Sequence, residues 1–305
     1  MDNTKNVISI ENLSFGYRQK IVLDDIGLDV PKGSIFGFLG PNGAGKTTTI
    51  KILLGLLRVP DNHCRLFGQD INHHRIEGLK LTGTMVEDPS LYDHLNATEN
   101  LRNNCIIRGV DRKRIAIVLE QVGLTADAHR KVRNYSSGMK QRLALAQALL
   151  PEPKLLMLDE PINGLDPAGI IDIRNLLIDL NVNHGITIFL SSHILTEIEK
   201  LCSHVAVINN KHILYQGSME GLLNANRTDV RLIVETDQPE KAKKLLGDLY
   251  TIESSGAHRI IVHLPYRNAS IQVARILVEA GIGILLLQPD NHELEASFLE
   301  LLKAN

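Results

Sequence analysis

The sequence contains no tryptophan, and Phe, Tyr and Trp together make up only 4% of its 305 residues. Its formal net charge is −2, so the chain has no excess of positive charge that would attract nucleic acid. With so few aromatic rings there is also little material for stacking unpaired bases. Nucleic acid is therefore not an expected partner.

Cysteine is scarce as well, with Cys64, Cys105 and Cys202 far apart and odd in number. This pattern argues against a disulfide framework and a zinc site, and favours reduced thiols. The sequence has no apolar signal-peptide run at its start and no stretch of the ~18 apolar residues that a membrane-spanning helix needs. Otherwise the composition is ordinary, and the length suits one large or two ordinary domains.

Short apolar runs predict how the chain is organised. Residues 7–10, 22–30 and 34–39 are expected to be strands, as are residues 154–158, 186–191 and 205–209. Their alternation with helical segments predicts an α/β fold with a mostly parallel sheet core and an antiparallel N-terminal part. Between residues 88 and 150 the strand signal is replaced by helical patterns, which predicts a helical insertion.

From about residue 228 the pattern starts again. Strand and helix signals in the order βαββαβ, with a final helix near residues 293–303, predict a small accessory α+β domain over residues 228–305. Residues 224–229 are polar and are the best candidate for a linker. The sequence therefore predicts two domains, at residues 5–222 and 228–305.

A glycine-rich stretch matches the pattern G-x-x-x-x-G-K-[ST] between a predicted strand and a predicted helix. Glycines let successive backbone N–H groups converge on a phosphate at the start of the helix. Lys46 would then pair with the β- and γ-phosphates, and the Thr47 hydroxyl would reach Mg²⁺. A turn that only caps the helix is the less favoured interpretation. The predicted phosphate loop consists of Gly40, Pro41, Asn42, Gly43, Ala44, Gly45, Lys46, Thr47 and Thr48.

Two carboxylates follow the apolar run at residues 154–158. At the carboxyl edge of the sheet, Asp159 is the natural second anchor for Mg²⁺. Glu160 is placed to polarise a water for attack on the γ-phosphate, which makes it the candidate general base. An isolated acidic pair is usually just the solvated end of a strand, and only the phosphate loop upstream favours the catalytic interpretation.

A third motif begins at Ser136, which is followed by Ser137 and Gly138. Taken alone, Ser136 is most simply the N-cap of the next helix. A helix N-terminus with a serine hydroxyl and a nearby glycine is also a second phosphate site, and both interpretations can hold together.

These motifs, in this order, resemble the ATP-binding subunit of an ABC transporter over roughly residues 5–220. The resemblance makes residues 40–48 the Walker A loop, residues 136–140 the signature loop, and Asp159 with Glu160 the Walker B pair. It implies that residues 163–166, ending at Asp166, form the D-loop and that His193 is the switch histidine. It also implies that Tyr17 stacks on adenine. Without the resemblance, a lone tyrosine or a histidine at a strand end is more often structural or a bystander.

The resemblance also implies a mechanism that uses ATP and Mg²⁺. Two copies would sandwich each ATP head to tail, between Lys46 of one subunit and Ser136 of the other, and hydrolysis would release the dimer. In the family this motion drives separate membrane-spanning permease subunits. We therefore expect an ATPase that lies peripherally on the cytoplasmic face of the cell membrane.

Two positions depart from the family pattern. Glu87 stands where most members have a glutamine, and we expect it to bind Mg²⁺ directly or through water. The plainer interpretation is a solvated loop acid. In the signature loop Ser137 replaces a glycine and Met139 replaces a glutamine, while Ser136 and Gly138 remain, so activity is expected to survive.

These departures, with residues 191–195 and the accessory domain, resemble the family branch that exports or confers immunity to peptide antibiotics of the bacitracin and lantibiotic types. The expected function is the motor of such an exporter, with the peptide contacted by the permease. Alternatives are a motor for lipids, drugs or polysaccharides, or a soluble ATPase acting on ribosomes or DNA. The single phosphate loop and the lack of sustained heptads disfavour the soluble ATPase. A regulatory module built on residues 228–305 is a further alternative.

Overall fold

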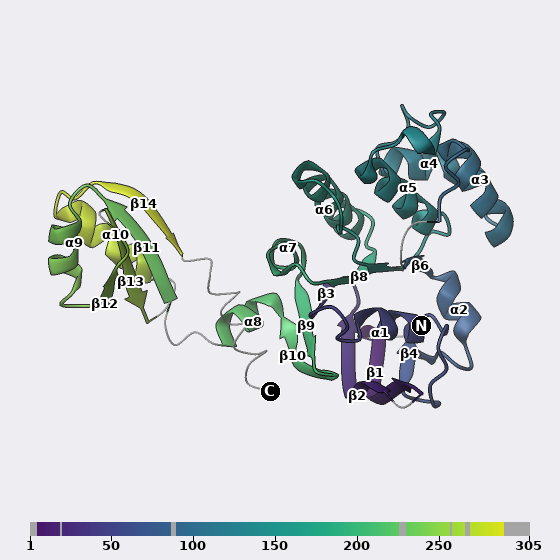
Figure 1. The fold of residues 1–305 in the computed structure, drawn as a ribbon, viewed down its shortest axis with the longest axis horizontal. Helices are drawn as coiled ribbons and strands as arrows, with labels where there is room; N and C mark the ends of the chain where they lie inside the picture. Colours follow the sequence, from purple (N-terminus) through teal and green to yellow (C-terminus); the bar gives the residue numbers. More distant parts are fainter. Residues whose placement is uncertain are drawn as a thin grey trace. The chain divides into compact units, whose positions relative to one another are not determined.

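A computed structural model describes residues 5–18, 20–86, 90–225, 230–256, 258–265 and 269–289 (Figure 1). The chain divides into two compact units, Met1–Met219 and Glu220–Asn305. Among the described residues, no helix is long and apolar enough to cross a membrane. The final helix expected near residues 293–303 lies outside the described residues.

The first unit begins with a four-stranded antiparallel sheet in the order β2-β1-β4-β5. From Ile26 onward, buried and exposed residues alternate along β2, so one face of this sheet packs on the core and the other faces solvent. Its strands are β1 (Asn6–Tyr17), β2 (Lys20–Pro31), β4 (Cys64–Leu66) and β5 (Gln69–Asp70). Helix α2 (Arg75–Lys80) follows β5.

A six-stranded sheet in the order β10-β9-β3-β8-β7-β6 forms the centre of the first unit. All its neighbouring strands pair in parallel except β9 and β10. Strands β3 and β8 are buried along their whole length, which is typical of a parallel sheet covered on both faces. The strands are β3 (Ile35–Leu39), β6 (Thr82–Met85), β7 (Leu155–Asp159), β8 (Thr187–Ser192), β9 (His204–Asn209) and β10 (His212–Ser218).

Helices cover both faces of this central sheet. In Figure 1, α6 (Pro167–Val182) and α7 (Leu195–Leu201) lie on one side, and α1 (Lys46–Leu53) lies on the other side with the antiparallel sheet. Because β3, β8 and β7 are parallel neighbours, their carboxyl ends meet at one edge of the sheet.

The helical insertion consists of α3 (Ala97–Arg108), α4 (Arg114–Gln121), the 3₁₀ turn Val132–Asn134 and α5 (Ser137–Leu149). Helix α3 begins with a capping box, in which Asn96 and Glu99 each accept a hydrogen bond from the other's backbone N–H. Helix α5 packs closely on β6, because a Cβ atom on Gly83 would collide with the carbonyl oxygen of Ala148. The insertion is thus attached to the central sheet through α5.

The second unit contains a four-stranded antiparallel sheet in the order β12-β13-β11-β14. Its elements, preceded by α8 (Met219–Ala225), are β11 (Val230–Thr236), α9 (Pro239–Leu246), β12 (Thr251–Ser254), β13 (Arg259–Leu264), α10 (Ala269–Glu279) and β14 (Ile284–Pro289). Val234 of β11, Val262 of β13 and Leu277 of α10 lie in one apolar core.

The predicted fold class is confirmed, with a mostly parallel core, an antiparallel N-terminal sheet, a helical insertion and a small α+β unit. Sequence patterns did not reveal the elements between residues 64 and 85, where β4, β5 and β6 have two to four residues each. Strands this short do not show an alternating pattern of their own.

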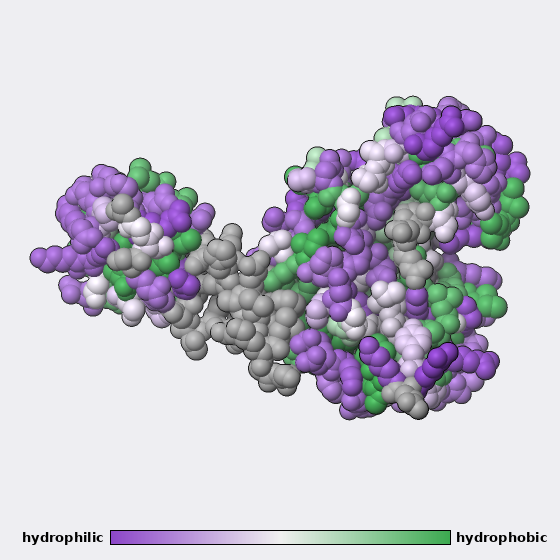
Figure 2. Space-filling model, viewed as in Figure 1, coloured by the Kyte–Doolittle hydropathy of each residue, from purple (hydrophilic) through white to green (hydrophobic). Residues whose placement is uncertain are grey.

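Hydrophilic residues cover much of the visible surface of the first unit in Figure 2. Hydrophobic residues gather beside α2 and at one end of α3 (Figure 2), where the large exposed apolar side chains belong to Ile76, Ile106 and Ile107. Exposed apolar groups that gather in one area mark contact surfaces more often than scattered ones do.

The three cysteines lie in the cores of the protein, where burial keeps their thiols protonated. Burial, with a smaller contribution from the Asp70 carboxylate, raises the pKa of Cys64 to about 12. Burial also raises the pKa of Cys202 and of Cys105. Because the thiolate is the reactive form, all three thiols should be inert in the folded protein.

We predict that iodoacetamide at about pH 8 modifies Cys64 in the native protein about a thousandfold more slowly than in guanidinium, where its pKa returns to the value of a free thiol. Mass spectrometry of the alkylated peptides at successive times measures both rates. Rapid labelling of Cys64 without denaturant would contradict its placement in the core.

Candidate nucleotide site

The loop between β3 and α1 requires glycine at several positions. Gly43 has φ 80° and Gly45 has φ 110°, which lie in the left-handed region that favours glycine. A Cβ atom on Gly45 would lie 2.6 Å from Cδ2 of Leu23, and one on Gly40 would collide with the carbonyl oxygen of Ile208. The close packing of β2 and β9 on this loop therefore explains the glycine pattern.

The loop leads into a helix N-terminus that is open to an anion. Among the side chains that the structure describes, none caps the first N–H groups of α1, whose N-cap residue is Gly45. Uncapped N–H groups and the positive end of the helix dipole together attract negatively charged groups such as phosphates.

Lys46 stands at the beginning of this helix with only 6% of its surface exposed. Its ammonium group donates hydrogen bonds to the carbonyl oxygens of Gly40, at 2.8 Å, and Pro41, at 3.3 Å. It also forms an ion pair with Oε1 of Glu160 at 3.3 Å. These partners compensate the buried charge and hold it over the loop.

Asp159, at the end of β7, is held by two hydroxyl groups. Thr47 donates to its Oδ2 at 2.8 Å, and Ser191 of β8 donates to its Oδ1 at 2.5 Å. The hydroxyl of Ser191 also accepts the backbone N–H of Glu160 at 2.9 Å. Ser191 was not predicted as a site residue. Its position at the polar end of a buried strand marks it as a residue at the sheet edge, but its partner Asp159 depends on the pairing of β7 with β8.

Glu160 lies between two basic side chains. Besides Lys46, its carboxylate contacts Nδ1 of His193 at 2.9 Å. Its backbone has φ 49°, which is unusual for a residue with a side chain and is found disproportionately at functional sites. The structure thus brings together Lys46, Glu160 and His193 from three separate motifs.

These groups surround a cavity of about 250 Å³, which we call the P-loop cavity. Val22 of β2, which was not predicted as a site residue, and Asn163, the first residue of the predicted D-loop, also line it. The lining consists of Val22, Asn42, Gly43, Gly45, Lys46, Thr47, Thr48, Glu160, Asn163 and His193.

The signature residues surround a different cavity of about 280 Å³, which we call the signature cavity. Ser136 is the N-cap of α5 and accepts the backbone N–H of Met139 at 3.3 Å, so its capping role is observed. Ser137 and Gly138 line the same cavity, as does Asp166, the N-cap of α6. The two cavities share no lining residue, so within one chain the signature residues stay apart from the phosphate loop.

The predicted roles of Tyr17 and Glu87 are not tested by the described cavities. Tyr17, at the end of β1, is 47% exposed and packs edge-on against Phe15 with ring centroids 5.2 Å apart. It does not belong to the described lining, so its contact with adenine stays a prediction. Glu87 lies outside the described residues, and its contact with Mg²⁺ stays a prediction too.

The donors near Asp159 suit a magnesium ion. Mg²⁺ prefers hard oxygen ligands and is usually held by one or two protein groups together with phosphate oxygens. The Thr47 hydroxyl and the Asp159 carboxylate, 2.8 Å apart beside the P-loop cavity, are such a pair. This donor chemistry fits the predicted ion.

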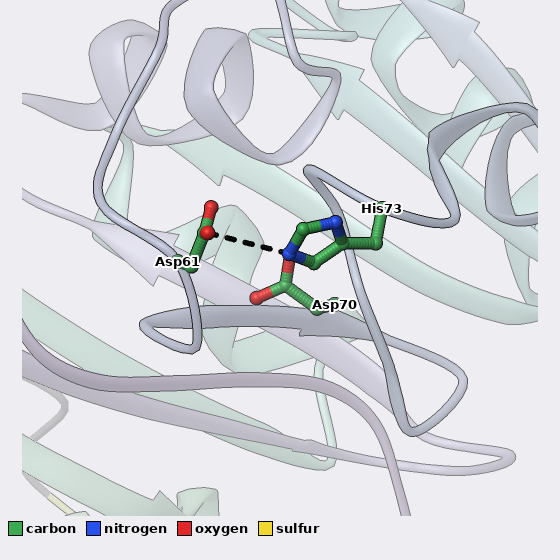
Figure 3. A group of neighbouring side chains, drawn as sticks. All are labelled: Asp61, Asp70 and His73. Carbon is green, nitrogen blue, oxygen red and sulfur yellow. Dashed lines mark ion pairs between the residues drawn. The ribbon is translucent and has the colours of Figure 1, made fainter.

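A second group of potential metal ligands lies away from this cavity and has a structural role (Figure 3). In Figure 3, His73 points toward Asp61, with Nε2 3.3 Å from Oδ2. Asp70 accepts the backbone N–H groups of Asn62, at 2.5 Å, and Asn72, at 2.8 Å. The pKa of Asp70 is lowered: desolvation by burial acts to raise it, but the hydrogen bonds from backbone N–H groups together outweigh that effect. Its two oxygens are therefore used to hold the loops beside β5.

Comparisons with known proteins agree with this geometry. Residues 23–163 match the family model described as "ABC transporter". The chain is 38% identical, over 97% of each protein, to the bacitracin transport ATP-binding protein BcrA of Bacillus licheniformis. It is 37% identical to the lantibiotic transport ATP-binding protein SrtF of Streptococcus pyogenes, over 72% of this chain and 93% of that protein.

A solved structure described as the ATP-binding subunit of an ABC transporter is also similar. It is 28% identical, with a TM-score of 0.63, over 72% of this chain and 92% of that one.

We predict that Ser191→Ala destabilises the protein by about 1–3 kcal/mol, because the N–H of Glu160 loses its acceptor in a partly buried place and Asp159 loses a hydrogen-bond donor. Thermal unfolding measured by calorimetry, with Ser90→Ala as the control, tests this, since Ser90 is exposed. Equal melting temperatures for the two variants would show that the Ser191 bridge contributes nothing.

Proposed function

The chain belongs to the ABC transporter family as an ATP-binding subunit, and on that premise we propose that it hydrolyses ATP to drive export of antimicrobial peptides through separate permease subunits. The observation that carries this proposal is the meeting of the phosphate loop, Glu160 and His193 around one cavity, with Asp159 bonded to Thr47 beside it. Residues 5–222 would be the ATP-binding domain and residues 228–305 an accessory domain.

In this proposal the phosphates occupy the open N-terminus of α1, with Lys46 paired to the β- and γ-phosphates. Thr47 and Asp159 would hold Mg²⁺, with Glu87 as a further ligand. When bound, the ion supplies positive charge that neutralises the phosphate oxygens. Tyr17 would stack on the adenine ring from the end of β1.

Glu160 would act as the general base. Its contact with His193 orients the carboxylate, and its ion pair with Lys46 holds it within reach of the phosphate-binding loop. Phosphate oxygens carry more negative charge than a carboxylate and would draw the Lys46 ammonium toward themselves. This leaves Oε1 of Glu160 to accept a proton from the attacking water.

The separation of the two cavities supports a shared site made by two copies. One chain places Lys46 in the P-loop cavity and Ser136 in the signature cavity. A second copy packed head to tail would bring the N-terminus of its α5 onto the exposed side of the nucleotide. Each ATP would then hold two chains together until hydrolysis removes the γ-phosphate contacts.

The similar proteins BcrA and SrtF are ATP-binding proteins of bacitracin transport and lantibiotic transport, and this similarity supports a peptide substrate for the transporter proposed here. The permease, rather than this chain, would contact the peptide. The chain would act as a peripheral subunit on the cytoplasmic face of the cell membrane.

A groove of about 350 Å³ is the proposed docking surface for the permease. It lies between the segment after α1 and helix α5, and its lining includes Leu56, Met85 and Ala144. Leu56 is 60% exposed, and nearby Ile76 of α2 is 67% exposed. A groove with both polar and apolar lining residues, beside exposed apolar side chains, suits an amphipathic helical segment of a partner.

We predict that Glu160→Gln binds ATP and accumulates as a dimer while turnover falls about a hundredfold or more, because the amide cannot accept a proton. Phosphate release and sedimentation measured with ATP and Mg²⁺ test both parts. Glu199→Gln, at an exposed position on α7, is the matched control. Parental turnover in Glu160→Gln would show that the base is a different residue.

We predict that Leu56→Asp keeps the ATPase activity of the isolated protein but abolishes resistance to bacitracin-type peptides in cells that also produce the permease subunits. The aspartate replaces an exposed apolar side chain of the docking groove with a charge and does not disturb the core. Val182→Asp, with a side chain 70% exposed on α6, is the control. Growth in the presence of the peptide measures the effect. Full resistance in Leu56→Asp would contradict the proposed docking surface.

A further inference from the structure

A large cavity in the first unit has no part in the mechanism above. Its volume is about 580 Å³, within the range typical of sites for small organic ligands. It lies among β1, β5, α2 and the amino-terminal ends of the central strands, where Lys154 directly precedes β7 and Thr187 begins β8.

Three apolar side chains, those of Val7, Phe67 and Leu81, form part of the cavity lining. Val7 is buried, and the other two are half-buried. An apolar lining of this kind favours a ligand with an apolar body.

Two lysines border the same cavity and are brought together by Thr187. The Thr187 hydroxyl accepts the backbone N–H of Gly33, next to Lys32, at 2.9 Å. The backbone N–H of Thr187 donates to the carbonyl oxygen of Lys154 at 3.0 Å. Thr187 thus links the loop that carries Lys32 to the loop that carries Lys154.

The charges at this cavity are not balanced internally. Lys32, Lys154 and Glu77 all line it, and within the described part of the chain none of the three has an ion-pair partner. Two ammonium groups against one carboxylate leave an excess of one positive charge. Both lysine side chains are exposed, and a net positive charge along a cleft steers anions toward it.

We propose that this cavity is a binding site for a small amphiphilic anion, whose apolar body contacts Val7, Phe67 and Leu81 and whose anionic group is bound by Lys32 and Lys154. The class includes aryl sulfonates, aryl carboxylates and short fatty acids. This proposal does not depend on the proposed transport function.

The site is separate from the nucleotide site but lies on the same strands. Strands β7 and β8 begin at the anion cavity, with Lys154 and Thr187, and end at the nucleotide edge, with Asp159 and Ser191. Parallel strands of five or six residues place these groups at opposite edges of the sheet. An anion and a nucleotide should therefore bind at the same time.

The test uses the full chain with saturating ADP and Mg²⁺, so that the nucleotide site is filled, and anilinonaphthalene sulfonate as the probe. We expect saturable fluorescence enhancement, and about tenfold weaker binding in the double variant Lys32→Glu/Lys154→Glu. The control Lys113→Glu/Lys131→Glu makes the same change in net charge at two exposed positions of the helical insertion and should bind as the parent does. Equal binding by parent and cavity variant, or an equal loss in the control, would overturn the proposal.

A second measurement locates the probe. Because the chain has no tryptophan, Gln69→Trp introduces the only indole, at a residue that lines the cavity. The probe should quench it more strongly than the indole of Ile107→Trp, on α3 in the helical insertion. Equal quenching in both variants would place the probe elsewhere and contradict the site.

Discussion

The parallel pairing of β7 with β8 is the constraint on which the nucleotide site depends. Their register sets Asp159 opposite Ser191, and the Ser191 hydroxyl then contacts both the Asp159 carboxylate and the N–H of Glu160. The neighbouring pairing of β8 with β3 places the phosphate loop beside these carboxylates. Residues from three motifs therefore converge because three buried strands end at one edge, and the ion pair of Lys46 with Glu160 is a consequence.

Much of this arrangement could be predicted from the sequence, because several site residues belong to short motifs that can be recognised without knowing the fold. The glycine spacing before Lys46 and the acidic pair after an apolar strand each indicate chemistry without knowledge of distant contacts. Ser191 could not be assigned in this way, since its role depends on which strand lies beside β7. The short strands β4, β5 and β6 were not recognised, because tertiary packing rather than periodicity makes them strands.

In the proposed mechanism one chain cannot form a complete nucleotide site, because the two halves of that site lie in separate cavities. The capping serine of α5 lies at the signature cavity, with the N-cap of α6, and not at the P-loop cavity. The N-termini of α1 and α5 are each suited to an anion. Within a single chain they line separate cavities and cannot hold the same phosphate group. In the proposed mechanism a second copy would supply what is missing, so that ATP binding and dimer formation would become one event and hydrolysis would move the attached subunits.

A complementation experiment tests this shared site most directly. One chain carries Lys46→Ala and the other carries Ser136→Arg, so that each homodimer has two defective sites. A mixed head-to-tail dimer combines both defects in one site and leaves the other site intact. The account predicts that neither variant hydrolyses ATP alone and that an equal mixture does, to an extent that follows the fraction of mixed dimers. A mixture as inactive as its components would contradict a nucleotide site shared between two chains.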